Sequence, residues 1–188
     1  MSNMLRRGIF LLGVLVMAAC AMPETRIYSL HMPADNLKTQ ARKQAMITVR
    51  VQSPRYLAQP YIAHRLSPYQ LEISRYAKWD SAPVEMVREI FKDSLSVVYQ
   101  DVRASNFAAE GSFVLNINLK RFERVEDSYA ELAFDAVLNS AEGRELYRIA
   151  VAKKVQIETR DSAGLAKGLS AALSESVKEV VAGLGVKI

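Results

Sequence analysis

The clearest pattern in the chain is a strict alternation of apolar and polar residues in its second half. In residues 113–122 (FVLNINLKRF), Phe113, Leu115 and Ile117 share one face, and residues 129–139 (YAELAFDAVLN) repeat the alternation. A third alternating run, residues 145–159, follows a turn at Glu142-Gly143. Because successive side chains of a strand point to opposite faces, each run predicts a half-buried strand. The short connections predict an antiparallel meander.

The first half of the chain contains shorter strand-like segments. Residues 46–52 (MITVRVQ) alternate in the same way, and residues 25–31 (TRIYSLH) predict a further strand near the start. Prolines at positions 54, 60 and 68 then divide residues 53–79 into pieces, among them YIAHRL and YQLEIS. Since proline cannot donate to a central ladder, we expect these two pieces to form a hairpin or to pair at a sheet edge.

Two segments have helical periodicity. Ser81 and Pro83 mark the predicted start of the first helix, whose apolar residues recur at helical spacing from Val84 to Val98. The second opens at Asp161 or Ser162 and is predicted to stop at Gly183. On it, Gly164 and Gly168 favour close packing onto a sheet over a helix-dimer motif. The predicted fold class is α+β, with a single twisted, mostly antiparallel sheet and two helices packed on one face.

The N-terminal segment RRGIFLLGVLVMAACAMPE (residues 6–24) has the pattern of an export signal. Its apolar run, residues 8–19, is shorter than the ~20 residues of a membrane-spanning helix. Two arginines before this run and small residues after it predict a secretory signal peptide, residues 1–19. Cys20, the single cysteine, follows Met17-Ala18-Ala19, which resembles the cleavage box of bacterial lipoproteins except that Met17 replaces the usual Leu. We therefore predict lipidation of Cys20 by fatty acyl chains such as palmitate; an ordinary signal peptide with a chance cysteine is the alternative.

Cleavage before Cys20 leaves 169 of the 188 residues, enough for one compact domain. We expect a lipidated tether over residues 20–24 and a folded domain over residues 25–188. Five residues reach at most ~18 Å, so the domain must stay close to its membrane. The net charge of +5 falls to about +3 without Arg6 and Arg7, a mild excess that suits anionic lipid or an acidic partner and does not indicate nucleic acid.

No motif for catalysis or for cofactor binding is present in the sequence. The two histidines, His31 and His64, lie in different predicted elements and form no helical metal pair. There is no Gly-rich phosphate loop after a strand and no Gly-x-Ser-x-Gly. The sequence therefore predicts a protein that is not an enzyme, with no metal and no cofactor.

Residues 55–79 concentrate aromatic and basic side chains, which are common at protein interfaces. They suggest a partner-binding surface. The alternative is that the rings fill the space between the sheet and the first helix, with the arginines solvated. The candidate contact residues are Arg55, Tyr56, Leu57, Tyr61, Arg65, Tyr69 and Trp79.

Several of these residues also carry a resemblance to the ABC-type transport auxiliary lipoprotein family. Members have a Tyr-x-Leu opening, a Pro-x-Tyr-Leu segment, an arginine-ended strand and a tryptophan before the first helix. The matching residues are Tyr28, Leu30, Pro54, Tyr56, Leu57, Arg65 and Trp79, whereas Asp80-Ser81-Ala82-Pro83 fits the usual acid and alanine less closely. The resemblance implies a paraquat-inducible-type lipoprotein that works with an MCE-domain lipid transporter in the periplasm, without catalysis. Ala21 after the cysteine, in place of Asp, favours the outer membrane.

Three functional hypotheses follow. The first is an outer-membrane lipoprotein that docks a periplasmic MCE-domain protein, with self-association of the chain as a further expectation. The second is a lipoprotein that activates or stabilises a cell-wall or envelope machine; such activators usually need longer linkers. The third is a lipid carrier, which needs an enclosed cavity for which two helices on one sheet leave little volume.

Overall fold

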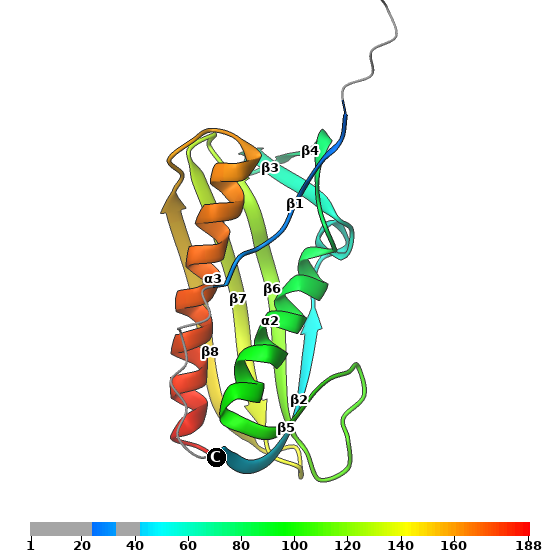
Figure 1. Ribbon diagram of the computed structural model, residues 1–188. Helices are drawn as coiled ribbons and strands as arrows, with labels where there is room; N and C mark the ends of the chain where they lie inside the picture. Colours follow the sequence, from blue (N-terminus) through cyan, green and yellow to red (C-terminus); the bar gives the residue numbers. More distant parts are fainter. Residues whose placement is uncertain (1–23, 33–41) are drawn as a thin grey trace, which may run out of the picture.

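The computed structural model describes residues 24–32 and 42–188, which form an eight-stranded sheet and two helices (Figure 1). The predicted signal peptide, Cys20 and the tether up to Pro23 lie outside the described residues. Strands β6 (Phe113–Val125), β7 (Tyr129–Asn139) and β8 (Glu145–Gln156) pair antiparallel in chain order. The predicted meander is therefore confirmed, and the inward residues of β7 from Ala130 to Leu138 are fully buried.

Two successive strands share the other edge of β6. Strand β2 (Lys43–Gln52) runs parallel to its first half, and β3 (Tyr61–Ser67) joins its end through the pair Arg65 and Val125. The 3-10 helix η2 (Arg55–Ala58) separates β2 from β3. It lies between Pro54 and Pro60, so the prolines break the chain where the sequence predicts.

The remaining strands complete a mixed sheet. Strand β4 (Gln70–Trp79) forms the predicted hairpin with β3, and β1 (Arg26–Tyr28) lies parallel to the end of β4. Strand β5 (Tyr99–Ala104), which the sequence analysis missed, runs parallel to β2. The pairs β1–β4, β2–β5, β2–β6 and β3–β6 are parallel, whereas β3–β4, β6–β7 and β7–β8 are antiparallel.

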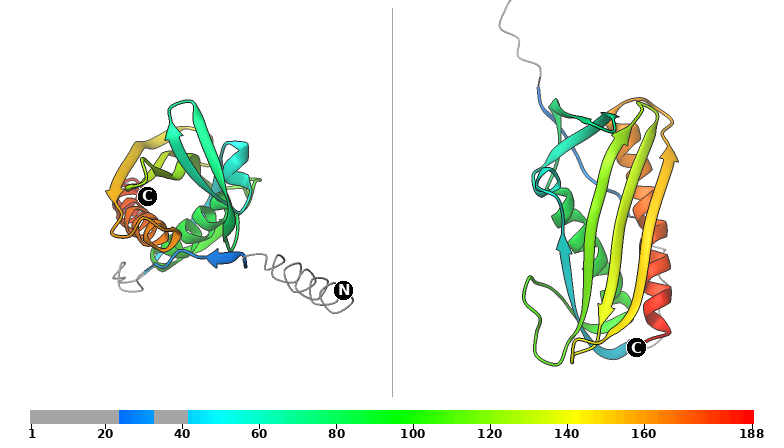
Figure 2. Two further views of the ribbon diagram at one scale, coloured as in Figure 1. Left: turned by 90° about the horizontal axis from the view of Figure 1, so that it is seen from above. Right: turned by 180° about the vertical axis from the view of Figure 1, so that it is seen from behind.

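Both helices cover the same face of the curved sheet, which confirms the predicted α+β class (Figures 1 and 2). Helix α2 (Pro83–Val98) packs on β2 and β5, and α3 (Ser162–Gly185) packs on β7 and β8. Phe91 of α2 meets Phe134 of β7 edge to face, with ring centroids 5.7 Å apart, so the helices and the meander share one core.

The helix ends differ in part from the prediction. Asp161 caps α3 by accepting a hydrogen bond from the main-chain N–H of Gly164 at 2.8 Å, as the sequence suggests. The helix continues past the predicted stop at Gly183 and ends at Gly185. Gly183 lies against the ring of Tyr147, where a larger residue would not fit, so this glycine serves packing and does not end the helix. At the start of α2, Ala82 occupies the cap position and no side chain caps the helix.

The molecule is elongated, and its two ends differ. One end carries the start of β1, the β3–β4 hairpin and the loop from β8 to α3 (Figures 1 and 2). The opposite end carries the C-terminus and the loop between β5 and β6. The described chain therefore enters the fold beside the hairpin.

Candidate partner-binding surface

Two of the seven predicted contact residues belong to the core. Leu57 of η2 and Trp79 of β4 are buried, and Trp79 packs edge to face on Phe122 with ring centroids 5.4 Å apart. The alternative interpretation, that rings fill the space between sheet and helix, therefore applies to Trp79. Neither side chain is available to a partner in this structure, so neither belongs to the exposed surface.

Tyr56 and Arg65 are held by a buried carboxylate that the sequence analysis did not identify. The Arg65 guanidinium donates to Glu123 of β6 through Nε at 2.5 Å and Nη2 at 3.1 Å, and the Tyr56 hydroxyl donates to the same carboxylate at 3.0 Å. The Glu123 side chain is 0% exposed and the Arg65 side chain 21%. These three residues, hereafter the Glu123 network, fasten η2 and β3 to β6.

The electrostatics of the Glu123 network keep its two donor side chains, Tyr56 and Arg65, protonated. Burial raises the pKa of the Tyr56 phenol, and the neighbouring negative charge of Glu123 raises it further, so the phenol keeps its proton and donates. The hydrogen bonds with Glu123 raise the pKa of Arg65. A buried carboxylate with three donors is therefore paired and solvated by the protein itself, which indicates a structural role.

A bulge in β6 brings Glu123 to this position. The pairing of β6 with β7 shifts between Leu119 and Arg121, so that Lys120 is the extra residue. After the bulge Phe122 points into the core and Glu123 points to the other face, toward η2 and β3. The polar run KRFERVED, residues 120–127, gives no sequence signal for a buried acid, because the burial of Glu123 depends on the distant strand β3.

Arg55, Tyr61 and Tyr69 are exposed. Arg55 is the first residue of η2 and Tyr61 the first residue of β3, and we call these two residues the η2 corner. Tyr69, in the turn between β3 and β4, is 99% exposed. Other apolar side chains of the same hairpin are also exposed, and together they form what we call the hairpin surface: Leu66, Tyr69, Ile73 and Tyr76.

Exposed cations border these apolar residues. Arg26, Arg55, Arg75 and Lys78 are all exposed, and within residues 24–32 and 42–188 none of them forms an ion pair with a carboxylate. The acids of this hairpin are limited to Glu72. The aromatic and basic character predicted for residues 55–79 is thus retained at the surface, although on fewer residues.

A second titratable cluster lies where β3 meets the end of β6. His64 Nε2 is 3.2 Å from a carboxylate oxygen of Asp127, close enough for an ion pair but without the geometry of a hydrogen bond. On the other side of the ring, Arg124 Nη2 is 3.4 Å from His64 Nδ1. Burial lowers the pKa of His64, and the positive charge of Arg124 lowers it further, against the opposing effect of Asp127 and Glu72. The imidazole is therefore neutral near pH 7.

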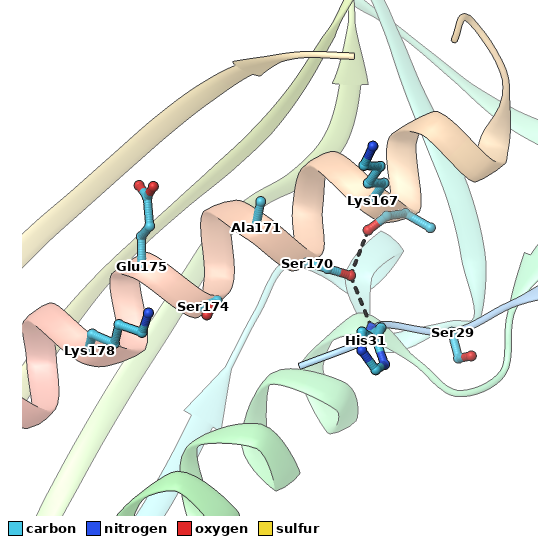
Figure 3. A pocket seen from close by; sticks show the side chains of 9 residues that line it. Ser29, His31, Lys167, Ser170, Ala171, Ser174, Glu175 and Lys178 are labelled. Carbon is cyan, nitrogen blue, oxygen red and sulfur yellow. Dashed lines mark hydrogen bonds between the residues drawn. The ribbon is translucent and has the colours of Figure 1, made fainter. Parts of the chain in front are cut away.

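The pocket in Figure 3 lies between the segment after β1 and the outer side of α3, and has a volume of about 550 Å³. The main-chain N–H of His31 donates to Ser170 Oγ at 3.0 Å, and Ser170 Oγ donates to the carbonyl of Ala166 at 2.7 Å. The imidazole takes no part in this contact, so the pair is not a serine nucleophile with a histidine base. Lys167, at the rim, pairs with Glu158 at 2.8 Å.

Two further features of the described part of the chain bear on function. In residues 24–32 and 42–188, no three side chains of the types His, Cys, Asp and Glu come together in a way that could hold a metal ion. Neither α2 nor α3 is both long and apolar enough to cross a membrane.

Comparison with known proteins gives a family match and several similar structures. The model of the ABC-type transport auxiliary lipoprotein component family matches residues 28–181. A Xanthomonas campestris protein of the DUF330 family is 18% identical, with a TM-score of 0.73, covering 85% of this chain and 94% of that one. A second structure, of an uncharacterised protein, is 15% identical, with a TM-score of 0.70, covering 86% and 99%. At these identities the two structures support the fold alone, and no match was found among curated proteins. Because the family model spans most of the chain, the protein belongs to the ABC-type transport auxiliary lipoprotein component family.

Proposed function

We propose that this protein is an accessory component of an MCE-type lipid transport system, anchored at the periplasmic face of the outer membrane by acylated Cys20. The observation that carries the proposal is the family match over residues 28–181, which names a transport auxiliary lipoprotein. The lipoprotein cleavage box before Cys20 and the Ala21 that follows it support the anchor and its membrane. The role is one of docking, without catalysis and without a cofactor.

The η2 corner is the proposed docking site for the MCE-domain protein. Arg55 and Tyr61 combine a cation with an exposed ring, the side-chain types that are enriched at interfaces. The Glu123 network includes Tyr56, which follows Arg55 in the chain, and it fixes η2 against β6. A rigid support of this kind keeps the contact residues in place, so little conformational entropy is lost on binding.

Co-purification from native membranes in mild detergent tests the docking role. Wild-type protein should retain the MCE-domain protein, and Arg55→Glu together with Tyr61→Ala should lose most of it. Arg144→Glu, an exposed arginine in the turn between β7 and β8, is the matched control for the charge change. If the wild-type protein retains no MCE-domain protein, the proposed partner is wrong.

The alternative function is an outer-membrane lipoprotein that activates or stabilises a cell-wall or envelope machine. The five-residue tether disfavours it, because such a protein must reach across the wall. Co-purification of a wall synthase in place of the MCE-domain protein would favour the alternative. Self-association of the chain is a separate proposal, and sedimentation of the Cys20→Ser protein over a range of concentrations tests it.

A further inference from the structure

The hairpin end of the molecule has exposed apolar residues that the docking role does not use. Tyr69 in the turn is 99% exposed, and Leu66, Ile73 and Tyr76 of the two strands are exposed as well. Ile27 of β1, the strand that pairs with β4, is also exposed. Several exposed apolar side chains on one hairpin and its neighbouring strand indicate a site of contact with a protein or a membrane.

The arrangement of these residues favours a membrane. In the β3–β4 register Ala63 lies opposite Ile73 and Arg65 lies opposite Leu71. Ile73 therefore lies on the same face of the hairpin as Arg65 and Leu71. The register shifts between Arg65 and Ser67, so Leu66 is the extra residue of a bulge beside the turn. Because Tyr69 in the turn is 99% exposed, its ring is open on every side. A flat protein surface would cover only one side of the ring, whereas lipid headgroups and upper acyl chains surround an inserted side chain.

The entry of the chain places the anchor on the same end. Glu24, Arg26 and Tyr28 line a pocket of about 610 Å³ together with Tyr76 of the hairpin surface, so the first described residues adjoin that surface. If Cys20 is acylated, the tether to Glu24 reaches at most ~18 Å. Strand β6 alone, with 13 residues, is about 40 Å long. The hairpin end is therefore held nearest to the lipid.

The charges suit the surface of a membrane. Arg26, Arg75 and Lys78 are exposed and have no carboxylate partner among the residues that the structure describes. Tyrosines are favoured at the membrane–water interface because the ring is apolar and the hydroxyl remains hydrated. Basic residues beside an apolar surface strengthen binding to anionic lipids.

We propose that the hairpin surface inserts into the headgroup region of the membrane that holds the acyl anchor, and so fixes the orientation of the domain on that membrane. The inference rests on the proposed acylation of Cys20 for its geometry, but it concerns a different contact from the docking of a transporter. The second contact removes the rotational freedom that a single flexible tether leaves. The η2 corner is then presented at a defined height above the lipid.

A fluorescent label at position 69 tests this inference. Because Cys20 is the single cysteine, Tyr69→Cys introduces the one thiol that remains free when Cys20 is acylated. Phe107→Cys is the matched control, since Phe107 is an exposed aromatic residue, 82% exposed, in the loop at the opposite end. The acylated full-length mature proteins carry an environment-sensitive dye and are placed in phosphatidylethanolamine–phosphatidylglycerol vesicles that contain a lipid-borne quencher.

We expect the label at position 69 to be blue-shifted and quenched several-fold more strongly than the label at position 107. Equal, water-like emission from both positions would overturn the inference. So would a label at position 69 that responds only when the MCE-domain protein is added, since the hairpin would then be a protein-binding site.

A second measurement does not depend on acylation. The Cys20→Ser protein should float with phosphatidylglycerol vesicles and lose this binding several-fold when Tyr69→Ser and Ile73→Ser are combined, while Phe107→Ser leaves it unchanged. Equal binding by all variants would also contradict the inference. Neither expected result requires the MCE-domain protein, so failure to bind vesicles leaves the docking proposal intact, and failed co-purification leaves this inference intact.

Discussion

At the scale of single residues, the motif shared with the family is architectural. Leu57 and Trp79 fill the core, and Tyr28 packs against it. Tyr56 and Arg65 hold the buried Glu123. Residues that recur in a pattern can thus identify the family without being the residues that contact a partner.

Arg65→Ala should destabilise the domain by about 3 kcal/mol, because it leaves the Glu123 carboxylate buried without its main partner. Urea unfolding measures the loss. Arg121→Ala is the control, because Arg121 likewise pairs with a glutamate, Glu131 of β7. The Arg121 side chain is 46% exposed, so the expected loss of stability is below about 1 kcal/mol. Equal losses in both variants would show that the Glu123 network is no more than a surface pair.

His64 should make stability depend on pH near neutrality. Its pKa in the folded protein is below the ordinary value of 6.5, so the unfolded chain binds more protons in this range. Its contribution is therefore fully present above pH 6.5 and is lost as the pH falls toward the lowered pKa. Unfolding by urea between pH 7.5 and pH 5.5 should show this loss, and His64→Gln should flatten the profile; an unchanged slope would contradict the assignment.

At the scale of elements, the periodic segments could be predicted and the long-range pairings could not. The meander and both helices follow from local spacing, for example from the alternation between Ala130 and Leu138. Strand β5 was missed because its six residues follow α2 without a turn and lack a clear alternation. The burial of Glu123 was missed because it depends on a bulge and on a strand nearly 60 residues earlier. The exposure of Tyr69, by contrast, is consistent with its place in a turn after Pro68.

Gly168→Ala should weaken the packing of α3 on the sheet. A Cβ at this position would lie 2.9 Å from the Cβ of Ala130 and 3.2 Å from a methyl group of Ile157, so the helix would have to shift. The strain of overpacking, about 1–3 kcal/mol, opposes a gain in helix propensity of about 1 kcal/mol. Thermal unfolding should show a net loss of stability, whereas Gly185→Ala, which meets nothing within 4 Å, should show none. A Gly168→Ala protein as stable as wild type would mean that the interface accommodates the methyl group.

At the scale of the whole molecule, the position of the chain entry determines what each end can reach. The hairpin end adjoins Glu24, Arg26 and Tyr28, and the opposite end carries the C-terminus and the loop between β5 and β6, to which Phe107 belongs (Figure 1). In the proposed orientation the η2 corner lies near the membrane and within reach of a transporter that crosses the periplasm. A docking protein of this kind gains from being held close to its membrane, because the tether sets the local concentration of the docking site.

Lengthening the tether separates the two functional hypotheses. Thirty Gly/Ser residues inserted between Pro23 and Glu24 leave the folded domain and Cys20 unchanged, so fractionation and thermal stability should match wild type. Effective concentration falls roughly as the −3/2 power of linker length, so the longer tether should lower it by about twentyfold and reduce docking. Sensitivity of the cell envelope to detergent should then increase, and removing the insert should restore resistance. An activator of a wall enzyme would instead tolerate the insertion or gain from the added reach, and this result would favour the alternative function.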